Sequence, residues 1–592
     1  MSNYLVVAMA RHLRPRIDDW LRTNKVTRTE YRFVPVETGF ILLMGRDVAR
    51  SVGPRNFLRG TVVSEDGTAI GYGLPAWSLA RTGRTRITGG EYVAATWSLR
   101  EAEVWTDTFG TVPLLHTAGP GIVAASDSLL VLADLRAHLG LPNSVDLEVV
   151  AARSRTLAIT SQMISSDTLY SEIERCPVGK RLRIMFGGVL PTSAVVGVDA
   201  FHAFSPVGLG YRDVIRRASA VAVGQVRAIS SIDGYVPMLS LTGGYDSRAV
   251  LAAASRAGVS KSLFIESHRR TDANVADYEA AVGLARSLGL DINHPANFDF
   301  GAPDVYGAPL GAVWASSHLG VYDRLVPTRS SNGKPRSIPM NGLGAEMAKG
   351  GYGWRSAEQT TAYYGTTRRD SSAYAGARRD AFAHQFRKGL RELGVPDDHP
   401  WASEWHYLGH RNGLHSGAHL AISLIGLRPL TQAILARYAL HPRPGSDGPR
   451  PTGAALVQDI LSVTDADMTS LPYETPERAI SSTYAVERQD ALGGPLLDEE
   501  IPDVTVWGTP GDAVSGPMSF GLGIANRWGY DFDLGPDQIV DQGRDWVAGI
   551  SDPATRGIYT ELLDLSSKEM QKWRPADAGP GPAKLLTARL LV

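Results

Sequence analysis

The hydrophobic positions in the first part of the chain come in short runs of strand length. These runs cover residues 4–9, 39–44, 92–99, 102–106, 121–125 and 181–184, with turn residues between them. Short apolar runs at close spacing predict layered antiparallel sheets with a few helices, such as one expected at 128–139. Up to about Val198 the chain is therefore predicted to be β-rich α+β.

Beyond Tyr211 the pattern changes to long helical periods that alternate with single apolar strands. Helices are predicted at 214–228 and 276–288, and a strand at 262–267. Alternating strands and helices predict a parallel sheet with helices on both faces. Prolines and glycines mark 199–210 as a connecting segment, so we expect one domain at 1–205 and another at 206–592.

The stretch from Val236 to Gly258 joins an apolar strand to an Ala-rich helix through Thr-Gly-Gly-Tyr-Asp-Ser at 242–247. A glycine pair lets the backbone approach an anion, and the first amides of a helix point unpaired at the ligand, so phosphate is expected here. Thr242 and Ser247 add hydroxyl donors. The carboxylate of Asp246 would repel phosphate unless a divalent cation lies between them, so the loop predicts a nucleotide with Mg²⁺.

Composition and charge narrow the range of partners. The formal net charge is −1, and the few basic clusters are short, so neither nucleic acid nor a membrane surface is expected as a partner. Cys176 is the only cysteine, which excludes an internal disulfide and a cysteine-rich metal site and suits a reducing cytoplasm. No apolar run approaches the roughly 20 residues that span a bilayer. We therefore expect a cytoplasmic protein.

Four stretches of the first part precede the loop at 242–247 in a characteristic order. They are residues 90–99, 105–115, 123–128 and 173–179. With the loop, this order resembles the asparagine synthetase B superfamily over most of residues 90–460, although the family's loop begins with Ser where Thr242 stands. The resemblance implies an Ntn-like, glutaminase-type antiparallel sheet sandwich. An α/β parallel-sheet domain of the ATP-pyrophosphatase type (adenine nucleotide α-hydrolase-like) with a helical extension would follow it.

The first domain departs from the family at its expected nucleophile. The family's glutaminase uses a cysteine exposed by removal of the initiator methionine, but Ser2 stands at this position and Cys176 is far away. Ser2 could act as a hydroxyl nucleophile activated by its own α-amine, yet the family's glutamine-binding motifs do not follow it. We expect no glutaminase activity. The branch of the family that works without glutamine hydrolysis includes β-lactam synthetase, carbapenam synthetase and the lasso-peptide cyclases. In these enzymes the substrate itself carries the attacking amine.

The resemblance also implies a set of ATP-binding residues. The adenine base would lie against the strand at 262–267 through the backbone of Phe264, Ile265 and Glu266. A second loop at 338–352 resembles the family's Gly-x-Gly-Ala-Asp-Glu-x-Phe-Gly-Gly, and Glu346 takes the place of its metal-binding acid beside Asp246. The full set is Leu239, Ser240, Leu241, Thr242, Gly243, Gly244, Tyr245, Asp246, Ser247, Ile265, Glu266, Gly342, Leu343 and Gly344. Asp277 is a further, minor candidate, whereas Asp272 suits the positive end of its helix.

Two residues that complete the reaction in the cyclising relatives are missing. Leu343 stands at the position of their amine-deprotonating tyrosine, and the segment 450–458, which matches that of their catalytic lysine, contains no lysine. Arg450 or Lys349 could supply the missing positive charge. Lys349 could equally be a surface residue at a loop end.

A histidine-rich stretch at 404–419 provides further candidates. His406, His410 and Arg411 could act as an acid or base beside the acyl acceptor. His406 with His410, and His415 with His419, also have a spacing compatible with zinc. Hydrogen-bonded histidines in a pocket wall are the favoured interpretation.

These patterns favour an ATP-dependent carbon–nitrogen ligase that uses ATP and Mg²⁺. It would convert a carboxylate into an acyl-adenylate with release of pyrophosphate, and an amine would then attack to form an amide, lactam or peptide macrocycle. Alternatives are a nucleotide-binding scaffold without activity, a glutamine-dependent amidotransferase using Ser2, and a tRNA sulfur-transfer enzyme, which the lone cysteine disfavours. The substrate would be a small molecule or peptide. A homodimer and a biosynthetic partner protein both stay open.

Overall fold

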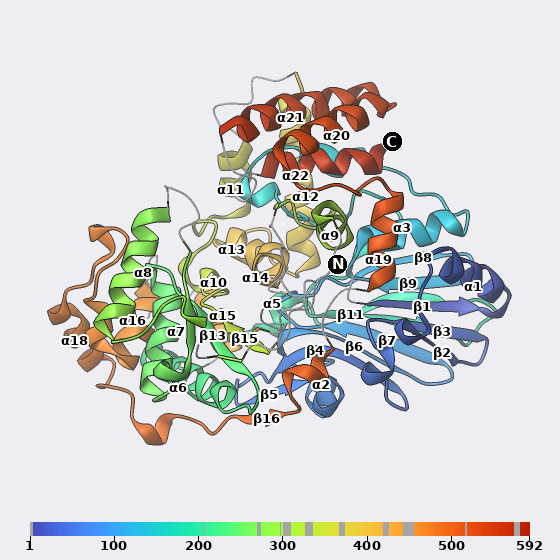
Figure 1. Ribbon diagram of the computed structural model, residues 1–592. Helices are drawn as coiled ribbons and strands as arrows, with labels where there is room; N and C mark the ends of the chain where they lie inside the picture. Colours follow the sequence, from blue (N-terminus) through green and yellow to red (C-terminus); the bar gives the residue numbers. More distant parts are fainter. Residues whose placement is uncertain are drawn as a thin grey trace.

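The structure, a computed structural model, combines two antiparallel-type sheets, a small parallel sheet and many helices (Figure 1). It describes residues 4–206, 208–268, 274–295, 298–299, 309–325, 336–365, 373–417, 426–441, 455–514, 518–572 and 580–592. None of the helices in these ranges is long and apolar enough to cross a membrane.

The first sheet has six strands, and every neighbouring pair is antiparallel. Its order is β10 (Ile173–Arg175), β8 (Leu115–Gly119), β9 (Ile122–Ser126), β1 (Leu5–Ala10), β3 (Gly39–Met44) and β2 (Tyr31–Pro35). All six residues of β1 are buried because both faces of this strand are covered. Leu5, Val7 and Met9 pack in one core with helices α1 (Arg14–Thr23) and α3 (Leu129–His138).

The opposite face of β1 contributes Val6 and Ala8 to a second core, which the other large sheet shares. That seven-stranded sheet has the order β12 (Thr192–Gly197), β11 (Lys180–Met185), β7 (Glu101–Thr106), β6 (Gly89–Trp97), β4 (Asn56–Val63), β5 (Ala69–Tyr72) and β16 (Thr505–Trp507). Its other face packs Leu58, Val62 and Trp105 against α2 (Trp77–Thr82). The strands expected at 4–9, 39–44, 92–99, 102–106, 121–125 and 181–184 are thus confirmed, within a few residues at their ends.

A third, parallel sheet has the order β14 (Phe264–Glu266), β13 (Val236–Ser240) and β15 (Ser337–Met340). Leu239 of the central strand packs in the same core as α6 (Tyr211–Ser230), α7 (Tyr245–Arg256) and α16 (Ala455–Thr464). Met238 packs with Phe264 on the other face. Alternate residues of β13 therefore serve opposite faces, as the strand-and-helix alternation predicts.

The two halves of the sequence share structural elements. β16 comes from the second half, yet it pairs in parallel with β5 and extends the seven-stranded sheet. Near the C-terminus, α20 (Pro536–Gly549), α21 (Pro553–Lys572) and α22 (Pro580–Leu586) form a helical layer at the top of Figure 1. The proposed boundary near residue 205 stays a prediction, and the packing crosses it.

One buried carboxylate ties the N-terminal and C-terminal helices together. Asp134 of α3 accepts hydrogen bonds from the indole N–H groups of Trp20, at 2.9 Å, and Trp528, at 3.0 Å. Arg527, the last residue of α19 (Ser519–Arg527), donates to the same carboxylate at 3.0 Å. Three elements that are distant in sequence thus meet at one side chain.

We predict that Asp134→Asn lowers the free energy of unfolding by about 2–3 kcal/mol, because the amide leaves buried donors poorly paired. Urea denaturation of the full chain measures this change. The control is Asp18→Asn, whose carboxylate pairs with Arg14 and is 45% exposed, and which should cost about 0.5 kcal/mol or less. Equal effects from the two variants would contradict the role given to Asp134.

Candidate functional site

The loop predicted to bind phosphate lies between β13 and α7, at the carboxyl end of the central parallel strand. Leu239 is fully buried in the strand, and Ser240 donates to the Glu266 carboxylate at 3.1 Å. Gly243 has no room for a side chain, because a Cβ there would lie 2.9 Å from the Cβ of Ala280. This crowding explains a glycine at this position.

The polar groups of this loop are hydrogen-bonded to one another. The Thr242 amide donates to the Ser247 hydroxyl at 3.1 Å, and the two hydroxyls also lie 3.1 Å apart. The Gly244 amide donates to the Thr242 hydroxyl at 3.3 Å, and the Gly243 amide donates to Asp277 at 2.8 Å. Asp277 therefore shapes the loop. A bound phosphate would exchange these internal hydrogen bonds for bonds to its own oxygens.

A third residue of the loop is fixed from outside. The Tyr245 hydroxyl donates to the Arg478 carbonyl at 2.5 Å, and its ring lies 4.9 Å from that of Tyr473. Tyr473 in turn packs under the Arg248 guanidinium, whose carbon is 3.6 Å from the ring centre. This cation–π contact holds the first turn of α7 against the segment 468–473.

The second glycine loop follows β15 and leads into α10 (Glu346–Lys349). Gly342 touches the first loop so closely that a Cβ there would come within 2.4 Å of the Asp246 backbone carbon. The Leu343 amide donates to Asn341 at 3.0 Å, and the Leu343 carbonyl accepts from Thr431 at 3.1 Å. Gly344 adopts a φ of +93°, which a side chain would strain.

Three predicted residues meet where the loops touch. Lys349 forms an ion pair with one carboxylate oxygen of Asp246, with 26% and 23% of the two side chains exposed. The other oxygen, Asp246 Oδ1, is buried and has no hydrogen-bond partner among the described residues. The Glu346 carboxylate accepts from the Gly344 amide at 2.9 Å. These three side chains come from two loops.

Burial and two neighbouring charges shift the pKa of the Glu346 carboxyl group. Burial raises its pKa above the ordinary value, the negative charge of Asp246 adds to this effect, and Lys349 opposes it. Mg²⁺ is commonly held by one or two carboxylates together with substrate phosphates. Asp246 and Glu346 fit that arrangement. Within the described ranges, no group of three or more His, Cys, Asp or Glu side chains could hold a metal by itself.

The strand expected to contact adenine is part of the parallel sheet. The Ile265 carbonyl accepts from the Asn293 amide at 2.9 Å, and the Glu266 carbonyl accepts from the Leu241 amide at 2.8 Å. Phe264 and Ile265 are buried. Since these carbonyls already pair within the protein, contact of adenine with this backbone stays a prediction.

Two histidines of the 404–419 stretch lie in the core. His406 and His410 are buried and stacked, with ring centres 4.6 Å apart. His406 shares a hydrogen bond with the Ile164 carbonyl at 2.7 Å. Burial lowers the pKa of His406 to about 3 and that of His410 well below its ordinary value, so both rings are neutral near pH 7. Their stacking fits a packing role better than a shared metal ion.

Several predicted positions lie outside the described residues. They are Ser2, Asp272, His419 and Arg450. The alternative nucleophile of the first domain and one of the two candidates for the missing positive charge therefore stay predictions.

The structure brings a tyrosine and an arginine to the second loop that sequence patterns did not single out together. Tyr407, at the start of a π-helix (η9, Tyr407–Asn412), packs on Gly351, where a Cβ would lie 2.5 Å from its ring. Burial, followed by the charge of Glu346, raises the pKa of Tyr407, while Arg411 opposes this. Arg411 donates to the Ala158 carbonyl at 2.6 Å and to Gln162 at 3.0 Å. A π-helix often marks a functional segment, but periodicity alone does not reveal it.

A buried glutamate shapes the end of the same loop. Glu404 Oε1 accepts hydrogen bonds from the Tyr352 amide at 2.9 Å and the Trp354 amide at 3.0 Å. Burial raises the pKa of Glu404, and these backbone donors oppose the rise. Glu404 thus positions backbone near the second loop.

The comparisons with known proteins leave the family open. No protein-family model matches this chain, and no curated protein matches it.

We predict that the buried imidazole of His406 makes the protein less stable in acid. The unfolded chain binds a proton near the ordinary pKa of about 6.5, whereas the folded protein does so only near about 3, so stability falls as the pH decreases between these values. From pH 7 to pH 5 the loss from this one group is about 2 kcal/mol.

Urea midpoints at both pH values measure the effect. His406→Asn should reduce the pH dependence, whatever its effect on stability at pH 7. His202→Asn, which changes a side chain that is 68% exposed, serves as control and should alter the pH dependence much less. An unchanged dependence in His406→Asn would show that the ring does not stay neutral.

Proposed function

We propose that this protein is an ATP-dependent carbon–nitrogen ligase that activates a carboxylate as an acyl-adenylate for attack by an amine. The observation that carries the proposal is the meeting of Asp246, Glu346 and Lys349 where Gly342 touches the first loop. Two carboxylates and one lysine beside a glycine-rich loop suit a nucleoside triphosphate bound with its metal ion. A loop for phosphate alone has no need of two carboxylates.

We infer that the finer architecture is that of the asparagine synthetase B superfamily. The two stacked sheets would be an Ntn-like sandwich without glutaminase activity, and the parallel sheet would belong to a domain of the ATP-pyrophosphatase type. Support comes from the order of the sequence motifs and from the position of both glycine loops after parallel strands. A cytoplasmic location and a small-molecule or peptide substrate belong to the same proposal.

The reaction has two steps. In the first, a carboxylate oxygen attacks the α-phosphorus of ATP, the bond to the bridging oxygen breaks, and pyrophosphate leaves. In the second, the amine attacks the acyl carbon and loses a proton, and AMP leaves with the electron pair of the broken C–O bond. Catalysis of such transfers depends mainly on positioning and charge stabilisation.

The roles of the loop residues follow from their contacts. Asp246 and Glu346 would hold Mg²⁺, which when bound supplies positive charge to the phosphate oxygens. The buried Oδ1 atom of Asp246, which lacks a partner in the described ranges, supports this role. Lys349 forms an ion pair with the Asp246 carboxylate. Once a ligand binds, its ammonium group could pair with the pyrophosphate oxygens instead.

Beside Lys349, we propose Arg411 as a second described residue that could supply the charge that the missing lysine provides in the resembled enzymes. It belongs to the same π-helix as Tyr407, whose ring packs on Gly351 of the second loop. Arginine stays charged at all ordinary pH values, so it can stabilise a developing oxyanion but cannot act as a base.

We predict that Asp246→Asn lowers carboxylate-dependent exchange of labelled pyrophosphate into ATP by at least about 10²-fold, since the metal site loses a charge. The exchange is measured with Mg²⁺ across a broad panel of carboxylic acids. The matched control is Asp233→Asn, an exposed aspartate before the same strand, which should exchange as the unmodified protein does. Nucleotide binding without exchange for any acid would favour a scaffold, and exchange that survives in Asp246→Asn would refute the assignment of the loop.

Arg411→Met should separate the two half-reactions. We expect pyrophosphate exchange to persist while amide formation slows by about 10²-fold, because the second step loses its cation. Arg411→Lys, which keeps the charge, should recover part of the rate. Equal loss of both half-reactions would mean that Arg411 acts through its structural bonds to Ala158 and Gln162.

A further inference from the structure

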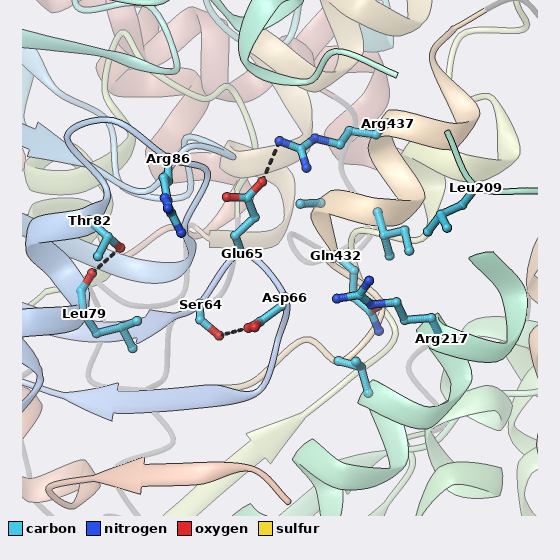
Figure 2. Close-up of a pocket in the computed structure, with 13 residues that line it drawn as sticks. Ser64, Glu65, Asp66, Leu79, Thr82, Arg86, Leu209, Arg217, Gln432 and Arg437 are labelled. Carbon is cyan, nitrogen blue, oxygen red and sulfur yellow. Dashed lines mark hydrogen bonds and ion pairs between the residues drawn. The ribbon is translucent and has the colours of Figure 1, made fainter. Parts of the chain in front are cut away.

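A cavity of about 420 Å³ lies between the N-terminal sheets and the helices of the second half (Figure 2). Its walls are the turn 64–68 between β4 and β5, helix α2 with the loop after it, α6, and α15 (Ala433–Ala439). None of its lining residues belongs to either glycine loop. The volume falls within the range of about 300–1,000 Å³ that is usual for sites of small organic ligands.

Direct contacts hold the walls of the cavity in place. Gln225 of α6 donates to the Gly67 carbonyl at 3.0 Å, and a Cβ on Gly67 would lie 2.4 Å from Val221. On the other side, Arg437 of α15 pairs with Glu65 at 2.6 Å, as the dashed line in Figure 2 shows. The turn 64–68 is therefore fixed to both helices, and the cavity is preformed.

Part of the lining is apolar. Leu79, Val221 and Ala433 are buried, and Ile434 is half-buried. These side chains come from three different elements and surround the polar turn. A ligand that fills the cavity would contact hydrocarbon as well as charge.

The cavity is lined by three arginines, Arg86, Arg217 and Arg437, and by two carboxylates, Glu65 and Asp66. Arg437 pairs with Glu65. Burial opposes ionisation of Asp66, but hydrogen bonds from Ser64 and Thr68 and the charge of Arg217 keep the pKa of Asp66 below its ordinary value. Glu65 therefore forms an ion pair, whereas Arg217 acts on Asp66 through its charge alone, with no ion pair between them among the described residues.

The third arginine is Arg86. Figure 2 shows it across the acidic turn from Arg217. Its guanidinium makes no hydrogen bond or ion pair with any residue in the described ranges. The cavity therefore has one positive charge more than its own carboxylates balance.

We propose that this cavity binds an organic monocarboxylate with an apolar body, whose carboxylate pairs with Arg86 while its hydrocarbon packs on Leu79, Val221 and Ile434. A planar guanidinium matches a carboxylate through two parallel hydrogen bonds. The single surplus charge favours a monoanion over a phosphate dianion, which would bring a second negative charge close to Glu65 and Asp66. The site is separate from the proposed nucleotide site.

Isothermal titration calorimetry on the full chain tests the proposal with straight-chain carboxylates from butyrate to decanoate and with 4-phenylbutyrate. Some of these acids should bind with one site per chain. The matching alcohols and alkyl phosphates should bind at least about tenfold more weakly, because they lack the fitting single charge. Binding should persist in Asp246→Asn, which separates this site from nucleotide chemistry.

Arg86→Gln should weaken carboxylate binding by about 10-fold to 100-fold, in line with the loss of a charged hydrogen bond. Arg81→Gln, an exposed arginine nearby that does not line the cavity, should leave it unchanged. Thr82→Trp, which fills the cavity from its exposed edge, should abolish carboxylate binding. The proposal is overturned if no acid binds, if phosphates bind more tightly than carboxylates, or if Arg86→Gln binds as tightly as the unmodified protein.

Discussion

Parallel pairing of β13 with β15 is the constraint from which the candidate site follows. Parallel strands end at the same edge of a sheet, so the loops that follow them must meet there. Asp246 and Lys349 are 103 residues apart in sequence and still form an ion pair at this edge. The contact requires glycine at position 342, because any side chain there would collide with the backbone of Asp246.

The shape of both loops depends on side chains that lie outside them. Asp277 binds the Gly243 amide, Thr431 binds the Leu343 carbonyl, and Glu404 binds the amides of Tyr352 and Trp354. Each of these groups satisfies backbone that would otherwise lack a partner. Loops held in this way can keep a fixed geometry before a ligand arrives, which lowers the entropy lost on binding.

The sequence predicted those parts of the structure that local patterns encode. The strands of the first part and the helices at 128–139, 214–228 and 276–288 were confirmed because each has its own apolar period. The meeting of Asp246 and Glu346 was also foreseeable, since each follows a glycine loop after a predicted strand. Local patterns predict a strand or helix best where its own apolar residues recur with the period of that element.

Other features depend on contacts between distant segments. β16 has only three residues and joins the seven-stranded sheet by pairing with β5. A run this short has no hydrophobic period that would predict the pairing. The same holds for the Arg86 cavity, whose walls come from four separate elements. His406 shows the opposite case: spacing made it a candidate ligand, whereas tertiary packing stacked it on His410. Tertiary context, not residue type, decided these roles.

The ion pair between Lys349 and Asp246 gives the site a resident counter-charge. Asp246 lies close enough to Glu346 for the two carboxylates to repel each other. This repulsion adds to the effect of burial in raising the pKa of Glu346, and the positive charge of Lys349 opposes both. Because about a quarter of each partner is exposed, the pair contributes at most about 1 kcal/mol. In the reaction proposed above, a divalent ion entering with phosphates would offer Asp246 a stronger partner and would offer Lys349 an anion in exchange. On this proposal, Lys349 neutralises Asp246 in the empty site and would pair with the ligand in the occupied one, at the cost of an ion pair that is itself weak.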